Sequence, residues 1–403
     1  MVTIHESTKL PPRKNAILDR AISLGCGQPA IPERLLLAHS RGEVLFIAGA
    51  GISKPANLPD FRGLVLSVYA QLDTVVHGFI PDKNTDLSSL TAQQAAEVKR
   101  YRKGDFDVVL GMLERRMDRQ TQGTSRVRQA VASELRRTGI RPAAIHRDLM
   151  RLADRGGVAT IVTTNFDLLL EDAAKQIRQK VLTYALGGIP RPGLNDGFGG
   201  VFHIHGVLDR DPARTSDLIL TDQDFGEFYL RRRVVPDLIY DAARLFNLVL
   251  VGYSANDPPM RYLLNAVAAD GTRFKDLKER FAFVDNSPPD PVKMEDWRGR
   301  GITPIPYDTV NDHFALQQGL KRWASLSAIT GKPSLVDAEV KRIVRTKRSA
   351  ASDSDRDLFD HLVRRCNSKE RIRLSDLVSK QKASFDWLDA IFEISMEKDL
   401  ERH

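Results

Sequence analysis

The sequence predicts an α/β protein with a doubly wound parallel sheet, a helical insertion and a C-terminal helical region. Short hydrophobic strands alternate with helical stretches over most of the 403 residues, which is typical of a parallel sheet covered on both faces. The strand at residues 44–48 runs into the small-residue turn Gly49-Ala50-Gly51-Ile52-Ser53, where the backbone can pass close to a bound phosphate. These observations predict a ligand-binding α/β domain that begins with this turn.

Composition excludes several classes of protein. No stretch approaches the roughly 20 apolar residues of a membrane helix, and the first residues lack the apolar core of a secretion signal. We therefore expect a cytoplasmic protein that does not associate with a membrane. Cys26 and Cys366 lie far apart in the sequence and cannot form a disulfide framework or a four-thiolate zinc site within one chain. The net charge of +8 favours anionic partners in general, and a direct or indirect role for nucleic acid stays open.

The first part of the chain contains the predicted insertion. We expect residues 1–40 to form a helical lead-in that packs on the first strand. After the turn, apolar residues recur at helical spacing over residues 64–72, and residues 88–135 are rich in helix formers and in Lys and Arg. The pattern predicts a helical insertion at about residues 66–150 with one solvated basic face.

The middle of the chain supplies two further strands that end in polar residues. Residues 158–164 form a β-rich run that breaks into Asn165-Phe166-Asp167, after which a helix is expected. The strand at residues 201–204 ends in His205-Gly206. Alternation along this strand puts His203 and His205 on one face.

The remaining strands complete the predicted sheet. The most strand-like run, residues 248–251, ends in Gly252-Tyr253-Ser254 and is followed by Asn256-Asp257-Pro258, an N-cap with a proline in the first helical turn. A largely helical segment precedes it at residues 224–244. Shorter strands are expected at residues 181–184, 218–221, 281–284 and 302–307.

A change in composition suggests a boundary near residue 330. Residues 1–330 are expected to hold the sheet and the insertion, and residues 331–403 a separate helical region rich in charge. In the last helix an apolar face suited to docking on the main domain or on another subunit is formed by Trp387, Leu388, Ile391, Phe392 and Ile394.

Polar turns follow four of the predicted strands and are expected to line one crevice, because the carboxyl ends of parallel strands meet at the same edge of a sheet. Together with Pro59-Asp60-Phe61-Arg62 they resemble the sirtuin family. The matches are its GAGxS turn at residues 49–53, its PDFR segment, its TxNxD segment at residues 163–167 with Thr164 where glutamine is usual, and its catalytic HG at His205-Gly206. The resemblance covers roughly residues 40–310 and implies a Rossmann-like fold that uses NAD.

The sequence also departs from protein-deacylating sirtuins. Those enzymes carry paired CxxC motifs for a structural zinc shortly after the HG pair, but residues 207–247 contain no cysteine. We therefore expect no zinc module and no bound metal. The segment from Gly252 through Asp257 and Arg261 resembles instead the divergent sirtuin-like domains of bacterial anti-phage systems: the Thoeris effector, the Argonaute-associated domains and, nearest in layout, the stand-alone partner of HerA-type ATPases. The sirtuin-like domains of these systems resemble NAD hydrolases that deplete NAD in infected cells.

The resemblance implies three catalytic residues. Asn165 would orient the ribose or the attacking water, Asp167 would sit by the nicotinamide carboxamide, and His205 would be the general base, a role that suits its unperturbed pKa of about 6.5. Asp167 has an alternative role as a cap of the following helix. His203 is interpreted as structural, because the family motif singles out the histidine before glycine.

The resemblance also implies a set of cofactor-binding residues. The backbone amides of residues 49–53 would hold the pyrophosphate, and the PDFR segment would form a mobile loop over the nicotinamide ribose. Ser254 and Asp257 would hold the adenosine ribose. The alternative role for Asp257 is to cap a helix without contacting the ligand. The full set is Gly49, Ala50, Gly51, Ser53, Asp60, Phe61, Arg62, Thr164, Gly252, Ser254, Asp257 and, on the adenine side, Tyr307.

The sequence thus predicts an NAD glycohydrolase that releases nicotinamide and ADP-ribose without a metal. The resemblance implies an anti-phage effector that is gated by homo-oligomer assembly or by a partner such as a HerA-type ATPase, with the insertion and the C-terminal helices as contacts. One alternative keeps the fold and changes the reaction to protein deacylation or ADP-ribosyl transfer. The other is a sensor of NAD or ADP-ribose, or a nucleic-acid-binding module, without turnover.

Overall fold

A parallel β-sheet forms the centre of the molecule in the computed structural model, which describes residues 20–81, 85–118, 125–193, 198–208, 218–253, 264, 277–381 and 385–400. Among these residues seven strands pair in the order β5-β6-β4-β3-β7-β8-β9, and every pair is parallel. The strands are β3 Val44–Ala48, β4 Thr160–Thr163, β5 Thr183–Ala185, β6 Gly200–His203, β7 Asn247–Val251, β8 Arg280–Asp285 and β9 Thr303–Tyr307.

The strand order confirms the predicted doubly wound sheet. Outward from the central β3 the strands are β4, β6 and β5 on one side, and β7, β8 and β9, which come later in the chain, on the other. The order therefore reverses between β3 and β7, and a ligand crevice is expected at the carboxyl ends of the strands beside this point.

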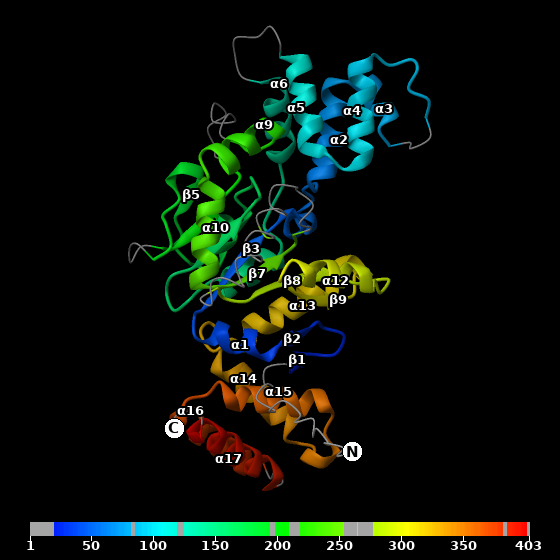
Figure 1. The fold of residues 1–403 in the computed structure, drawn as a ribbon. Coiled ribbons are helices and arrows are strands. Elements are labelled where there is room, and N and C mark those ends of the chain that lie inside the picture. Colours follow the sequence, from blue (N-terminus) through cyan, green and yellow to red (C-terminus); the bar gives the residue numbers. More distant parts are fainter. Residues whose placement is uncertain are drawn as a thin grey trace, which may run out of the picture.

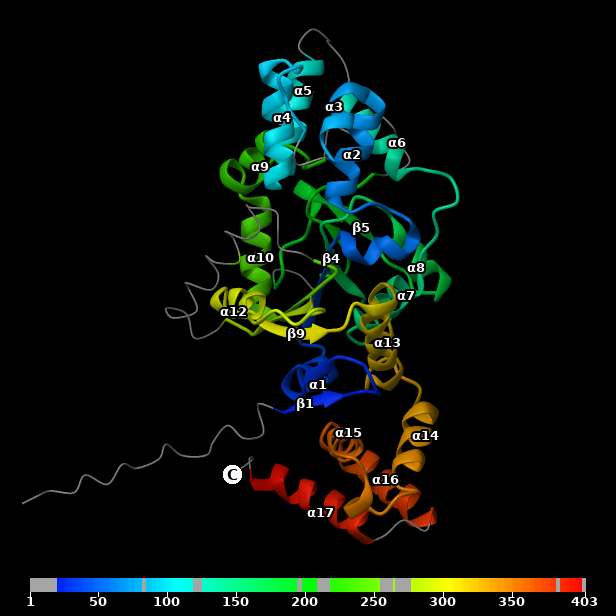
Figure 2. The ribbon, with the colours of Figure 1, turned by 90° about the vertical axis from the view of Figure 1, so that its right-hand side faces the viewer.

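Both faces of the sheet are buried, as expected for parallel strands. Along β3, Phe46 packs with one group of helices and Ile47 with the other. The first group consists of α1 Glu33–Ser40, α7 Ala144–Leu152, α8 Leu169–Gln176 and α13 Val310–Leu326. The second consists of α10 Val234–Leu245 and α12 Pro291–Gly299, and Figure 2 shows the sheet between the two groups.

Helices extend from the sheet at opposite ends of an elongated molecule (Figure 1). At one end lies the insertion, which has its own core and comprises α2 Phe61–Leu72, α3 Thr74–Phe79, α4 Ala92–Lys103, α5 Phe106–Met117 and α6 Arg126–Leu135. At the other end lie α14 Pro333–Ile343, the short η5 Arg348–Ala350, α15 Asp353–Arg364, α16 Ser368–Lys380 and α17 Phe385–Leu400.

The C-terminal helices share a continuous core with the sheet. Trp387 on α17 is fully buried against Phe359 on α15, with ring centroids 4.6 Å apart. Arg364 on α15 makes a buried ion pair with Glu33 on α1, 3.1 Å between Nη1 and Oε2. Trp387, Ile391 and Ile394 of the predicted apolar face therefore pack within the chain, whereas Phe392 is 68% exposed. No helix in the described ranges is long and apolar enough to cross a membrane.

Two sequence-based expectations about local structure are wrong. Within residues 1–40, the described part contains an antiparallel pair of short strands, β1 Ala21–Ser23 and β2 Ala30–Pro32, before the helix. Residues 218–221 do not form a strand, because side chains from elsewhere bind the backbone groups that a ladder would use. The connecting helices α9 Asp222–Phe225 and the π-helix η4 Gly226–Arg231 follow directly.

Candidate functional site

A cavity of about 870 Å³ opens at the carboxyl ends of the central strands. It lies where the strand order reverses, which is the expected position of a ligand site in such a sheet. The candidate residues that line it are Ala50, Gly51, Ser53, Asp60, Phe61, Arg62, Thr164, Asn165, Asp167, His205, Gly252 and Tyr307. Gly49 lies beneath the lining, and Ser254 and Asp257 lie outside the described residues.

The glycines of the first turn bring two strand ends together. The Gly49 N–H donates to the Val251 carbonyl at 2.9 Å, and the Gly51 N–H donates to the Gly252 carbonyl at 2.8 Å. A Cβ on Gly49 or Gly51 would lie within 3.0 Å of the Gly252 carbonyl oxygen. Close approach of β3 and β7 therefore explains both glycines. The amides of Gly49 and Gly51 bind these carbonyls and are therefore not available for the pyrophosphate. The turn continues as a seven-residue 3₁₀-helix, η1 Ala50–Ala56.

Ser53 joins the two turns that follow β3 and β4. Its hydroxyl donates to Oδ2 of Asp167 at 2.9 Å and accepts a hydrogen bond from Nδ2 of Asn165 at 3.0 Å. The serine is 2% exposed, so water does not compete for these bonds. Because the hydroxyl has one proton, which it gives to the carboxylate, it fixes the Asn165 side chain with its nitrogen toward Ser53.

This arrangement leaves the Asn165 carbonyl oxygen unused. Asn165 is 7% exposed and lines the cavity, and its Oδ1 has no hydrogen-bond partner within the described part of the chain. A buried acceptor without a partner costs free energy unless a ligand or water satisfies it. The backbone of the same residue is held from below, since its N–H donates to the Thr163 hydroxyl at 3.0 Å.

Asp167 contacts both the start of the following helix and the cavity, which are the two positions predicted for it. Its Oδ1 accepts the N–H of Leu169, the first residue of α8, at 3.1 Å, although the N-cap position itself is Leu168, and its side chain also lines the cavity. Burial raises the pKa of the carboxyl above its ordinary value, and the bonds from Leu169 and Ser53 offset this in part.

His203 is fully buried and holds Asn165 from behind. Its Nδ1 donates to the backbone carbonyl of Asn165 at 2.8 Å, and its Nε2 donates to Oε1 of Glu171 at 2.9 Å. Two acceptors require two N–H groups, which only the imidazolium provides. Burial alone would lower the pKa of His203, but the hydrogen bond and charge of Glu171 raise it above its ordinary value. The structural interpretation of His203 agrees with these contacts.

His205 sits in the cavity wall as a neutral ring. It is 7% exposed, its Nε2 is 2.7 Å from the Tyr229 hydroxyl, and the Phe225 ring contacts it edge-on. Burial lowers its pKa to about 3. The ring is thus unprotonated at neutral pH.

The PDFR segment is the start of a helix, contrary to the expected loop. Asp60 is the N-cap of α2, with its Oδ1 accepting the Gly63 N–H at 2.9 Å, and Phe61 and Arg62 occupy the first turn. Asp60 also pairs with Lys54 at 3.1 Å, and Tyr101 of the insertion donates to the Arg62 carbonyl at 3.3 Å. The aspartate, after a proline and before an apolar helix, is the sequence signal that predicts this cap.

Tyr307 lies at the far end of the cavity, at the end of β9. Its hydroxyl is 3.0 Å from Nδ1 of His313, and burial raises its pKa above the ordinary value. Asp285 at the end of β8 pairs with Lys293 in the same wall. Glu171, Phe225 and Tyr229 could not be predicted as site residues, because buried carboxylates and aromatic core residues carry no local sequence signal. No cluster of three or more metal-ligating side chains occurs among the described residues.

Comparisons with known proteins give a family match and a similar bacterial protein. A model of the SIR2-like domain family matches residues 159–305. An uncharacterised protein of Sinorhizobium fredii, y4cA, is 32% identical over 359 residues, which is 84% of this chain and 28% of that protein. This chain therefore spans little more than a quarter of the relative's length.

Two solved structures are similar at 15% identity. One is a Sir2 homologue in complex with NAD, with a TM-score of 0.35 over 74% of this chain and 95% of that one. The other was solved for the mechanism and regulation of Sir2 enzymes, with a TM-score of 0.32 over 73% of this chain and 98% of that one. The family match shows that residues 159–305 are similar to a SIR2-like domain.

Proposed function

We propose that this chain is an NAD glycohydrolase, which cleaves the bond between nicotinamide and ribose to give nicotinamide and ADP-ribose. The observation that carries the proposal is the buried Asn165 side chain, fixed by Ser53 and with its Oδ1 unpartnered in the cavity beside His205. The SIR2-like domain supports NAD as the substrate. The cavity volume lies within the roughly 300–1,000 Å³ of small-molecule sites.

The chemistry asks little of the protein beyond positioning. The C1′–N bond breaks with its electron pair leaving on the nicotinamide nitrogen, which is already cationic and needs no general acid. A water oxygen then bonds to C1′, and its proton passes to a base. The cationic sugar of the transition state needs shielding from bulk water and acceptors nearby.

The described residues meet these needs. Oδ1 of Asn165 is an acceptor for a ribose hydroxyl or for the attacking water, and its direction is set by the bond to Ser53. His205 lines the cavity as a neutral imidazole, which is the form that a base for the proton of the water must have. Asp167 supplies a carboxylate oxygen near the same wall, where it would face the nicotinamide carboxamide.

The biological setting is part of the proposal. We propose a cytoplasmic anti-phage effector whose activity is held back until a homo-oligomer or an ATPase partner assembles on the insertion or the C-terminal helices. The length of the Sinorhizobium relative, more than three times that of the matched segment, supports a setting in which such domains act with further modules.

The test is nicotinamide release from NAD by the purified chain, followed by chromatography, alone and with an encoded neighbouring ATPase and DNA. Asn165→Ala and His205→Ala are expected to abolish release. Matched controls are Asn247→Ala, a 9% exposed asparagine with two hydrogen bonds outside the cavity, and His39→Gln, a buried histidine whose pKa burial lowers to about 4.

The same assay separates the alternatives. Release that requires an acyl-lysine peptide would indicate a deacylase, and ADP-ribose attached to protein would indicate a transferase. Binding of NAD without release in any condition would indicate a sensor and would refute the hydrolase.

A further inference from the structure

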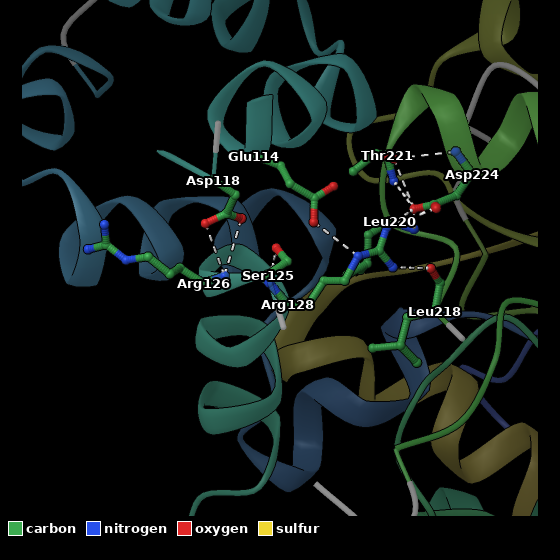
Figure 3. Close-up of polar contacts among 9 residues, drawn as sticks. All are labelled: Glu114, Asp118, Ser125, Arg126, Arg128, Leu218, Leu220, Thr221 and Asp224. Carbon is green, nitrogen blue, oxygen red and sulfur yellow. Dashed lines mark hydrogen bonds and ion pairs between the residues drawn. The ribbon is translucent and has the colours of Figure 1, made fainter. Parts of the chain in front are cut away.

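Arg128 on α6 connects the insertion to the sheet domain through a buried polar cluster (Figure 3). Its Nε donates to Oε1 of Glu114 on α5 at 3.0 Å. Its Nη2 reaches both oxygens of Asp224 at 2.8 and 2.7 Å, and its Nη1 donates to the Leu218 carbonyl at 2.7 Å. The arginine is 9% exposed, so these contacts are largely shielded from water.

The partners of Arg128 hold one short segment, residues 218–225, which we call the His205 strip. Oδ2 of Asp224 accepts the backbone N–H groups of Leu220 and Thr221 at 3.0 and 2.9 Å, and the Thr221 hydroxyl at 2.9 Å. The strip lacks the strand pairing that would otherwise fix its position. Its conformation therefore depends on Asp224, and Asp224 is bound by an arginine of the insertion.

The His205 strip in turn supports the histidine. The Ile219 N–H donates to the His205 carbonyl at 2.8 Å, and the Phe225 ring contacts the imidazole with centroids 5.5 Å apart. Ile219 and Phe225 also line the cavity. A displacement of the strip thus moves the wall of the cavity and the group next to it.

We propose that Arg128 is a positioning residue, through which the helical insertion sets the placement of His205 in the cavity. The inference rests on the proposed function for its kinetic consequence. This connection gives the insertion a regulatory role. Contact with another protein that shifts α5 and α6 would also shift the Arg128 guanidinium, and with it the His205 strip and His205. A cluster of one arginine and two carboxylates suits this role because its bidentate geometry is lost with small displacements.

The experiment compares Arg128→Met with Arg116→Met. Arg116 makes an equivalent cluster inside the insertion, with bonds of 2.8 Å to both oxygens of Glu97 and 2.8 Å to Asp73, and it does not line the cavity. Both substitutions remove a shielded arginine from two carboxylates. Loss of fold stability is therefore common to the two, and any effect on His205 is specific to Arg128.

Two readouts are measured on the full chain. The first is the His205 ring signal in NMR spectra of histidine-labelled protein, assigned with His205→Ala. The second is kcat and KM for NAD cleavage. We expect Arg128→Met to shift the His205 signal and to lower kcat by about ten- to a hundredfold with a smaller change in KM. Arg116→Met is expected to leave both close to wild type, and Arg128→Lys to fall between.

The outcomes distinguish this inference from the proposed function. Equal effects of Arg128→Met and Arg116→Met on the His205 signal would overturn the inference, even if wild type cleaves NAD. A His205 shift confined to Arg128→Met would support it, even if wild type cleaves nothing. Should Arg128→Met fail to fold, Arg128→Lys and Asp224→Asn carry the same comparison, and an unchanged His205 signal in both contradicts the inference.

Discussion

Replacement of Ser53 by alanine tests the arrangement on which the proposed reaction depends. The hydroxyl bridges two side chains of the cavity wall, from Asn165 Nδ2 at 3.0 Å to Asp167 Oδ2 at 2.9 Å. The change removes one oxygen and leaves the backbone and the packing volume almost unaltered. Any effect is therefore due to the two hydrogen bonds.

The magnitude follows from the partners. A bond to a charged group contributes about 1.5–3 kcal/mol and a neutral one about 0.5–1.5 kcal/mol, and both former partners stay buried. We expect the free energy of unfolding to fall by about 2–4 kcal/mol. The freed Asn165 amide can rotate, and a loss of about 2 kcal/mol in transition-state binding would lower kcat roughly 30-fold.

The assay pairs urea unfolding with nicotinamide release, and Ser327→Ala is the control. Ser327 is 4% exposed and accepts the N–H groups of Ile329 and Thr330 at 3.1 and 3.3 Å, far from the cavity lining. It should lose similar stability and keep its kcat. If Ser53→Ala is destabilised like the control but cleaves NAD at the wild-type rate, Ser53 does not orient Asn165 and the reasoning is wrong.

Other predictions test separate parts of the structure. Because burial lowers the pKa of His205 to about 3, kcat/KM should not fall through protonation of this ring between pH 8 and 5. An acid limb near 6.5 that coincides with protonation of the His205 ring in NMR spectra would contradict its burial. The pKa of His203 is raised in the folded state, so the pairing of its imidazolium with Glu171 stabilises the fold below about pH 6.5, and this stabilisation is lost as pH rises through the folded pKa. In urea unfolding, Glu171→Gln should therefore lower the free energy of unfolding by about 1.5–3 kcal/mol at pH 6 and by less at pH 9. Gly252 has φ +62°, and a Cβ there would lie 2.6 Å from the Ile52 nitrogen, so Gly252→Ala should lower the free energy of unfolding by about 2–4 kcal/mol. Gly139→Ala, at φ +88° with open space around it, should lower it only by the cost of the backbone conformation. Equal losses in the two variants would refute the argument that crowding explains Gly252. Metal analysis of the purified chain is expected to find no stoichiometric zinc, and chelators should leave nicotinamide release unchanged.

Local sequence patterns were enough to predict the doubly wound sheet and the polar strand ends that line the cavity, and the resemblance to sirtuins implied the other lining residues. Strand periodicity, glycine turns and the polar residues after each strand are features of a few neighbouring residues, and the topology of a parallel sheet then brings the strand ends together. The same patterns misassigned residues 218–221, where four apolar or β-branched residues form no strand. Thr221 and Asp224 form a capping box at the start of α9, which is a local signal that the strand assignment overlooked. The bond from Arg128 to the Leu218 carbonyl joins residues 90 positions apart and has no local signal.

The sequence by itself thus determined the fold class, the crevice and the candidate groups Asn165, Asp167 and His205. Only the tertiary structure decided the state of those groups. The bond that orients Asn165 joins residues 112 positions apart, and the pair that ties the insertion to the His205 strip joins residues 96 positions apart. Burial, pKa and hydrogen-bond direction depend on such distant neighbours, because they are set by what fills the space around a side chain and not by what precedes it in the chain.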